Sequence, residues 1–171
     1  MVEMVESTME QSKKPELKGV NIGIGEFKVG GFVMTSIGLG SCIAVVLHDK
    51  KKAIGGVAHV MLPNSNDKKD RPGKYADTAV PELLEGLIAE GSNKRDIIAK
   101  IAGGSSMFRQ FKGNLDIGGR NIEAVKESLN LNRIPLEGED TGGNVGRSIM
   151  YDPGRNGAIV IRRADGTCIN I

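Results

Sequence analysis

The sequence contains no tryptophan, and only two tyrosines and four phenylalanines among its 171 residues. Bases and sugar rings stack on aromatic side chains, so this chain offers little surface for such ligands. Charge of one sign is also missing, because 23 Lys and Arg residues stand against 21 Asp and Glu residues, for a net charge of +2. Nucleic acids and anionic membranes attract proteins through an excess of positive charge. The composition therefore predicts no nucleic-acid partner.

Long hydrophobic runs are absent as well, since no stretch approaches the roughly 20 apolar residues of a membrane-spanning helix. The first residues include Glu3, Glu6 and Glu10, where a secretory signal peptide carries a basic segment and an apolar block. Only two cysteines are present, Cys42 and Cys168, which make no disulfide framework. These features predict a cytoplasmic protein without stable membrane insertion.

Glycine is abundant, with 24 residues against 6 prolines, and the glycines occur in clusters. Such clusters indicate tight turns and close backbone approaches. The length suits one domain with its own hydrophobic core. Residues 1–18 are polar and lack periodicity, so we expect a disordered N-terminal tail there and a single domain over residues 19–171.

Hydrophobic periodicity predicts an α/β fold of the mixed α+β type. Segments 76–90 and 121–129 carry apolar residues at helical spacing. Pro81 fits the first turn of a helix, so the first helix is expected to begin near residues 78–80. Short apolar runs predict strands at 21–26, 32–37, 42–47, 54–62, 97–101, 134–136, 148–151, 158–163 and 167–171. The expected architecture is a layered sandwich with a mostly antiparallel β-sheet core and two main outer helices.

Segments 42–47 and 54–62 are separated by a charged stretch and predict a β-hairpin. Both are apolar at nearly every position, which is typical of strands covered on both faces, so the hairpin is expected to be central. If the turn is centred just after Lys50, Cys42 lies directly opposite His59, with Cβ atoms roughly 4.5–5.5 Å apart. That register brings a thiol within reach of an imidazole.

A thiol beside an imidazole favours nucleophilic catalysis, because an imidazolium lowers a cysteine pKa from about 8.5 into the range of roughly 3.5–7.5. Gly40 and Ser41 precede Cys42, and an open glycine turn frees backbone N–H groups to form an oxyanion hole. A hydroxyl just upstream, on Ser36 or Thr35, is a candidate to orient the imidazole.

Each of these residues also has a purely structural interpretation. A lone cysteine in an apolar run is usually a small buried hydrophobe, and a single histidine in a strand is usually a core residue. A hydroxyl near the end of a strand commonly binds the backbone. Spacing alone leaves both interpretations open.

The other candidate sites are weaker. The glycine-containing segments 103–106 and 141–144 lack the Gly-Lys-Ser/Thr core of a phosphate-binding loop. Two histidines and two cysteines show no metal-ligand spacing, so we predict no metal site, and we also predict no cofactor. Cys168 is expected to be inert, and His48 is expected to be solvated in a charged turn.

The residues around Cys42 and His59 belong to a longer series of motifs. The series comprises residues 38–42, 58–63, 73–79, 100–104, 107–108, 117–118, 120–121 and 139–144. In this order and without a large gap, it resembles the chemoreceptor glutamine deamidase family, CheD. The resemblance covers the chain from about residue 20 to about residue 160.

The resemblance implies that Cys42 is a nucleophile and that His59 is its base. The third residue of the family's site is a threonine six positions before the cysteine, where this chain has Ser36, with Thr35 one place earlier. The implied activity converts glutamine side chains of methyl-accepting chemotaxis receptors to glutamate through a thioester, as part of chemotaxis adaptation. The implied fold is a layered α/β sandwich.

The resemblance also implies two partners, namely the receptors as substrates and a CheC-type phosphatase bound near Met61, Met107 and Phe108. The alternative is a non-catalytic chemotaxis adaptor that binds and regulates such a phosphatase or the receptors. A third hypothesis, a cysteine peptidase, is disfavoured because no acid or amide partner for the histidine is evident.

Overall fold

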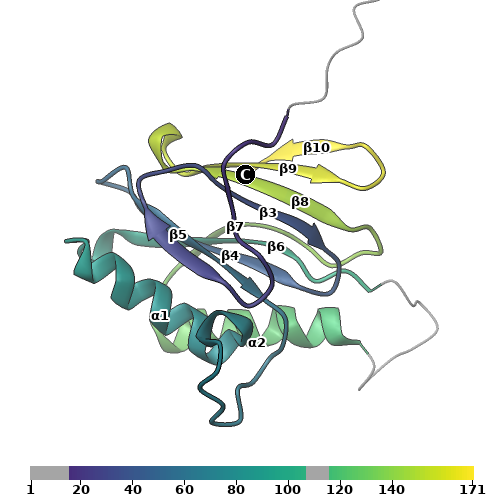
Figure 1. The fold of residues 1–171 in the computed structure, drawn as a ribbon, viewed down its shortest axis with the longest axis horizontal. Helices are drawn as coiled ribbons and strands as arrows, with labels where there is room; N and C mark the ends of the chain where they lie inside the picture. The colour runs from purple at the N-terminus through teal and green to yellow at the C-terminus, as the bar shows by residue number, and fades with distance from the viewer. Residues whose placement is uncertain (1–15, 107–115) are drawn as a thin grey trace, which may run out of the picture.

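The computed structural model describes residues 16–106 and 116–171. Most of the predicted tail, residues 1–18, lies outside these ranges, and so do Met107 and Phe108. Within the described part, two five-stranded sheets and a pair of helices are stacked in three layers (Figure 1). Both helices cover the outer face of one sheet, and the other sheet covers its inner face.

The first sheet contains, in spatial order, β1 (Val20–Asn21), β3 (Met34–Leu39), β8 (Arg147–Asp152), β9 (Ala158–Arg163) and β10 (Cys168–Asn170). The second contains β2 (Phe27–Gly30), β5 (Gly55–Val60), β4 (Ile43–Asp49), β6 (Ile97–Gly103) and β7 (Leu136–Thr141). The helices are α1 (Ala76–Ala89) and α2 (Ile117–Leu131), with short 3-10 helices at Pro72–Lys74, Lys94–Asp96 and Pro153–Arg155. Among these described strands, β1–β3 and β6–β7 pair in parallel and the other pairs are antiparallel. The predicted α/β sandwich, mostly antiparallel with two outer helices, is confirmed.

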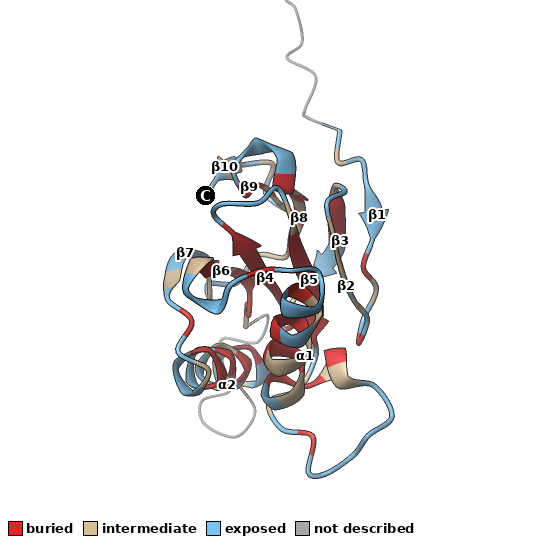
Figure 2. Ribbon diagram, turned by 90° about the vertical axis from the view of Figure 1, so that its left-hand side faces the viewer, coloured by how far each residue is buried: buried red, intermediate tan, exposed pale blue. Residues whose placement is uncertain are grey.

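The alternating side chains of β4 divide the interior into two cores. Ile43, Val45 and Leu47 belong to the core under the helices. Ala44 and Val46 belong to the core between the two sheets. Every residue of β4 and β5 is buried, as the red strands in the middle of Figure 2 show. The prediction of a central hairpin covered on both faces is therefore confirmed.

Helix α1 begins earlier than the sequence predicts. The Ala76 N–H donates to the Leu62 carbonyl at 3.0 Å, and the Asp77 carboxylate accepts from the N–H and the hydroxyl of Ser65, each at 2.9 Å. Pro81 consequently lies inside the helix, where its missing N–H leaves a carbonyl one turn earlier without its helical donor. The prediction that Pro81 occupies the first turn is wrong, because contacts with distant residues fix where the helix starts.

The segment 23–26 turns where the sequence predicts an extended strand. The Glu26 N–H donates to the Gly23 carbonyl at 2.9 Å, and the Glu26 carboxylate accepts from the Gly23 N–H at 2.8 Å. The predicted strand over 21–26 is wrong because this acidic side chain closes a turn. The three C-terminal strands, β8, β9 and β10, pair in sequence as an antiparallel meander. Within residues 16–106 and 116–171, no helix is long and apolar enough to cross a membrane.

Candidate active site

The register of β4 against β5 places Ala44 opposite His59. The prediction that Cys42 faces His59 directly is wrong by two residues. The turn is centred one residue later than predicted, and moving the centre of a hairpin turn by one residue shifts each cross-strand pair by two. The Asp49 carboxylate fixes that turn by accepting from two of its N–H groups at 2.8 and 3.1 Å. Only an odd shift exchanges the faces of a strand, so Cys42 and His59 still share one face. Cys42 is the diagonal neighbour of His59 in the core between the sheets.

The imidazole of His59 is held by Ser36, which reaches it from the other sheet. His59 Nδ1 lies 2.9 Å from Ser36 Oγ and 3.4 Å from the Ile22 carbonyl oxygen. The Ser36 hydroxyl donates its own proton to the same carbonyl at 3.0 Å. Both neighbours of Nδ1 therefore act as acceptors, which assigns the ring proton to Nδ1 and leaves a lone pair on Nε2.

Thr35 does not take part in this contact. Successive side chains of a strand point to opposite faces, so Thr35 and Ser36 lie on different sides of β3. The Thr35 carbonyl accepts from the Ile22 N–H at 2.7 Å, which aligns the segment before β2 with β3. Of the two hydroxyls that the sequence left open, the structure brings the one of Ser36 to His59.

Burial favours the neutral forms of both the Cys42 thiol and the His59 imidazole. Burial raises the pKa of the Cys42 thiol, and burial also lowers the pKa of His59, against smaller raising effects of a hydrogen bond to Ile22 and of the Glu26 charge. His59 Nε2 is buried without a hydrogen-bond partner among the described residues, so the thiol is not bonded to it. Cys42 is 9% exposed. Both pKa shifts favour the neutral thiol and the neutral imidazole over the thiolate–imidazolium pair expected from the sequence.

A β-bulge shapes the turn that leads to the cysteine. The pairing of β3 with β8 shifts by one residue between Ser36 and Leu39, and Gly38 within the bulge has a φ of 71°. A bulge bends its strand and redirects the residues that follow. The chain thereby leaves the first sheet after Leu39 and enters the second sheet one residue after Cys42.

Within the described part of the chain, the Cys42 N–H makes no hydrogen bond to the neighbouring strand of the second sheet. Ile43 pairs with Gly103, so Cys42 and Gly104 form the next pair of the ladder, and the Gly104 N–H donates to the Cys42 carbonyl at 2.9 Å. The reciprocal bond is missing among the described hydrogen bonds, because Gly104, with a φ of 69°, turns its carbonyl toward Gly118 at the start of α2. A Cβ on Gly118 would meet that oxygen at 2.6 Å, so only glycine fits. The result is an N–H on the cysteine that no ladder bond occupies.

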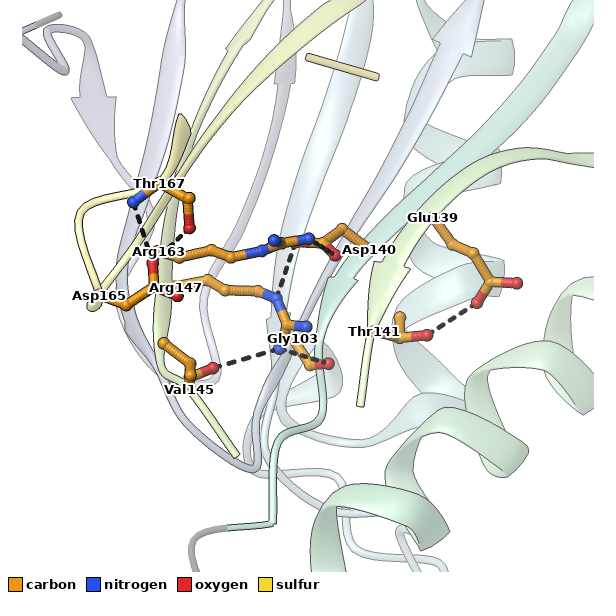
Figure 3. A network of polar contacts seen from close by, with 9 residues as sticks. All are labelled: Gly103, Glu139, Asp140, Thr141, Val145, Arg147, Arg163, Asp165 and Thr167. Atoms are coloured by element: carbon orange, nitrogen blue, oxygen red, sulfur yellow. Dashed lines mark hydrogen bonds and ion pairs between the residues drawn. The ribbon is translucent and has the colours of Figure 1, made fainter. Parts of the chain in front are cut away.

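An ionic network of buried Asp140 and Arg147 with half-buried Arg163 joins the two sheets at this end of the sandwich. The Asp140 carboxylate accepts from Arg147 Nε at 2.9 Å and from Arg163 Nη2 at 2.7 Å (Figure 3). Arg147 also donates to the Gly103 carbonyl at 3.4 Å, next to the residue pair that releases the Cys42 N–H. The two guanidinium groups hold the pKa of Asp140 below its usual range, in spite of its burial. Removing Asp140 would leave the buried guanidinium of Arg147 without a counterion.

Asn121 is a residue of the site that sequence reasoning missed. Its side chain is fully buried on the face of α2 that also carries Val125 and Leu129. Its Nδ2 donates to the Ser41 carbonyl at 2.9 Å and to the Met61 carbonyl at 3.0 Å. The sequence does contain a signal for this residue, because Asn121 lies on the apolar face of a helix, where a buried amide needs hydrogen-bond partners.

A hollow of about 320 Å³ adjoins the glycine turn, lined by Gly38, Leu39, Gly40, Gly146, Arg147, Ser148, Arg162, Arg163 and Ala164. Gly38 and Gly40 have no atom within 4 Å of a hypothetical Cβ, so the turn is sterically open. Met61, at the end of β5, is 39% exposed, whereas Met107 and Phe108 lie outside the described residues. The turn is therefore accessible to a side chain that enters from the surface.

The remaining histidine and cysteine lie away from this site. His48 is 3% exposed, so the prediction that it is solvated is wrong, because the end of β4 continues between the sheets. Cys168 is exposed on β10 and remains a free thiol, as does Cys42. Among the described residues, no group of three His, Cys, Asp or Glu side chains converges as a set of metal ligands.

A thiol, an imidazole and a hydroxyl arranged on a layered α/β sandwich are typical of the hydrolases that use a cysteine. Comparison with known proteins identifies the family. Residues 61–163 match the family described as CheD chemotactic sensory transduction. The chain belongs to the CheD family, as the motifs in its sequence indicate.

The curated relatives support this assignment over most of the chain. The chemoreceptor glutamine deamidase CheD of Thermotoga maritima is 49% identical over 147 residues, which cover 85% of this chain and 92% of that protein. The probable chemoreceptor glutamine deamidase CheD of Methanococcus vannielii is 45% identical over 128 residues, covering 74% and 82%. The protein of the same description from Clostridium kluyveri is 44% identical over 148 residues, covering 83% and 91%.

Proposed function

We propose that this chain is a protein-glutamine deamidase that converts specific glutamine side chains of methyl-accepting chemotaxis receptors to glutamate. The proposal rests on the position of the His59 imidazole, which lies on the same sheet face as Cys42 and is oriented by Ser36. Its Nε2 has no hydrogen-bond partner in the part of the chain that the structure describes. Family membership supports the substrate class, because the relatives are named as chemoreceptor glutamine deamidases. The reaction serves chemotaxis adaptation in the cytoplasm.

The first half of the reaction forms a thioester. His59 Nε2 takes the thiol proton as Cys42 Sγ attacks the carboxamide carbon of the bound glutamine. The tetrahedral intermediate carries a negative oxygen, which the N–H groups of Ser41 and Cys42 stabilise beside the open turn at Gly40. The imidazolium then gives its proton to the amide nitrogen, the carbon–nitrogen bond breaks, and ammonia leaves.

The second half releases glutamate. His59 removes a proton from a water molecule, whose oxygen attacks the thioester carbon, and the carbon–sulfur bond then breaks. The proton returns from the imidazolium to Cys42 Sγ, so the enzyme is regenerated as a neutral thiol. Ser36 keeps the Nδ1 proton in place during both halves, which preserves the basic Nε2.

The raised pKa of the Cys42 thiol supports a role for His59 as the general base that removes the thiol proton during the attack. A thiol that is mostly protonated at pH 7 needs proton removal during the chemical step, as a serine nucleophile does. The lowered pKa of His59 keeps its imidazole unprotonated at neutral pH, which suits this role. No cofactor takes part in the steps proposed here.

A CheC-type phosphatase is proposed as a second partner, docking near Met61 beside the site. Met61 is 39% exposed, and a flexible thioether suits a surface that accepts an apolar helix. Its carbonyl is fixed by Asn121, so the exposed side chain stands on a rigid support. Binding there would compete with the receptor for access to Cys42.

A second candidate function is a non-catalytic adaptor that binds and regulates the phosphatase or the receptors. The observation that favours it is the neutral resting thiol, which makes no hydrogen bond to His59 Nε2. An adaptor needs neither an unpaired basic nitrogen nor an oriented imidazole, however. Deamidation distinguishes the two, because only the enzyme changes the mass of the receptor.

The experiment incubates the full chain with the purified cytoplasmic domain of a methyl-accepting receptor from the same organism. Mass spectrometry of the glutamine-containing peptides then measures conversion to glutamate. We expect conversion at particular glutamines by the wild-type protein. A folded wild-type protein that binds the receptor domain but converts no glutamine would support the adaptor instead.

A further inference from the structure

We propose that Asn121 is a positioning residue that aims the Cys42 N–H at the oxyanion of the reaction, an inference that rests on the proposed deamidase function. Among the described residues, no hydrogen bond joins Asn121 to the thiol of Cys42 or to the imidazole of His59. It acts through the two backbone carbonyls that its amide binds, one next to the nucleophile and one near the base. It is thereby a single side chain that links α2 to both halves of the site.

The orientation of the Asn121 amide is fixed by its partners. Both are carbonyl oxygens, those of Ser41 at 2.9 Å and of Met61 at 3.0 Å, and a carbonyl only accepts hydrogen bonds. The amide nitrogen therefore faces them and uses both of its protons. Ser41 directly precedes Cys42, and Met61 follows His59 by two residues, so the amide ties the strand of the base to the turn of the nucleophile.

The contact with Ser41 determines where the Cys42 N–H points. The Ser41 carbonyl and the Cys42 N–H belong to one planar, trans peptide unit, so they point in opposite directions. When Asn121 holds the carbonyl from the side of α2, the N–H is aimed away from the helix. A hydrogen bond to the carbonyl also polarises the peptide unit and makes its N–H a stronger donor.

The neighbouring carbonyls of the turn are held in the same way. The Gly40 carbonyl accepts from the Ser105 N–H at 2.9 Å, and the Cys42 carbonyl accepts from the Gly104 N–H at 2.9 Å. Both of these donors are backbone groups, whereas Asn121 supplies the only side-chain donor to these three carbonyls among the described residues. A substitution can therefore remove the middle contact without changing the backbone of the turn.

The amide oxygen of Asn121, which accepts no hydrogen bond from the described residues, indicates why an asparagine is present at this position. Asn121 Oδ1 is buried and has no hydrogen-bond partner among the described residues. A buried acceptor without a donor costs stability, which an apolar side chain on this helix face would avoid. The donors of the amide are accordingly the part that the site uses.

The test compares Asn121→Ala with Asn132→Ala in a Cys168→Ser background, so that Cys42 is the single thiol. Asn132 is the matched control, because its Nδ2 also donates to a backbone carbonyl, that of Ser128 at 2.7 Å, at the far end of the same helix. We expect Asn121→Ala to lower kcat for receptor deamidation about 100-fold, with KM changed less than about threefold. Asn132→Ala is expected to change neither.

A second measurement separates aiming from a loss of structure. Alkylation of Cys42 by iodoacetamide builds no oxyanion, so its rate at a fixed alkaline pH should change less than about threefold in Asn121→Ala. Asn121→Asp, which has the same shape but offers no donor pair, should lose at least as much kcat. Equal losses of kcat and of alkylation rate, or an unimpaired Asn121→Ala, would overturn the inference. A wild-type protein without deamidase activity would instead overturn the proposed function on which it rests.

Discussion

The two ends of the sandwich each hold a buried histidine whose Nδ1 meets a hydroxyl. At one end His59 Nδ1 lies 2.9 Å from Ser36 Oγ, and at the other His48 Nδ1 lies 2.7 Å from the Tyr151 hydroxyl. Burial lowers the pKa of both histidines. Their rings also face the same space, because His48 and His59 lie on β4 and β5 with side chains between the sheets.

The difference between the ends lies in what surrounds the histidine. His59 has Cys42 as its diagonal neighbour, and within residues 16–106 and 116–171 neither His59 Nε2 nor the Cys42 N–H has a hydrogen-bond partner. Near His48 the charges are those of Lys100 and Asp49, and its ring packs edge-on against Tyr151. A buried histidine–hydroxyl pair is thus a structural unit that this fold uses twice. Chemistry requires the nucleophile and the oxyanion donors in addition.

The largest expected effect comes from the two cysteines. Cys42→Ala removes the nucleophile, so deamidation should fall by about 10⁴-fold or more, whereas Cys168→Ala should leave it unchanged. Conversion of receptor glutamines, measured by mass spectrometry, gives both rates. Urea unfolding of each variant provides the control for folding. Comparable activity of Cys42→Ala and wild type would end the assignment of Cys42 as nucleophile.

The two histidines should differ by a smaller factor. His59→Gln removes the base but keeps an amide of similar size, and we expect about a 10³-fold loss of kcat. His48→Gln should lose stability through its bond to Tyr151 while retaining kcat within about threefold. The measurement is kcat at a temperature at which both variants are folded. If His48→Gln lost as much activity as His59→Gln, the two ends would not differ in the way described.

The two hydroxyls sharpen the comparison further. Ser36→Ala should lower kcat about tenfold, because the Ile22 carbonyl still holds Nδ1, and Ser36→Thr should restore most of the rate. Tyr151→Phe removes the corresponding hydroxyl at the other end and should leave kcat unchanged. Steady-state kinetics on the receptor domain measures all three. A rate for Ser36→Ala equal to that of wild type would contradict an orienting role.

The smallest effect concerns pH and stability. Both histidines have a folded pKa below the unfolded value of about 6.5, so the unfolded chain binds more protons in the intervening range. Their contribution to stability is present above about pH 6.5 and is lost as the pH falls toward the folded pKa values. When the free energy of unfolding is measured in urea at several pH values, His48→Gln should lose less stability than the wild type as the pH falls. The acid limb of kcat/KM, set by His59, should not move in that variant.

The sequence correctly predicted that Cys42 and His59 lie on the same face of the sheet, although the predicted pairing of the two strands was displaced by two residues. The alternation of a strand preserves faces under an even shift, so the error in the turn did no harm to that conclusion. The turn lies one residue later than predicted because the Asp49 carboxylate binds the backbone of the turn, a contact that hydrophobic periodicity does not indicate. A one-residue error would have put the thiol under the helices.

Other parts of the site depend on contacts that no local pattern contains. Ser36 rather than Thr35 contacts His59 because Ser36 lies on the face of β3 that is turned toward the second sheet. The tautomer of His59 depends on the Ile22 carbonyl, which accepts hydrogen bonds from both side chains. The contact of Asn121 joins residues 60 and 80 positions apart in the chain. Periodicity predicts which side of an element is buried, but pairing between distant elements decides which polar groups meet there.

The most direct test of the account is a search for the covalent intermediate. The Cys168→Ser protein is mixed with excess receptor domain and quenched in acid within the first turnover, and the thiol-containing peptide is then mapped by mass spectrometry. The account predicts a thioester between Cys42 and a receptor glutamine that has lost ammonia, formed more slowly in His59→Gln. Glutamate appearing at the full rate while the acyl group is found on another residue would contradict it.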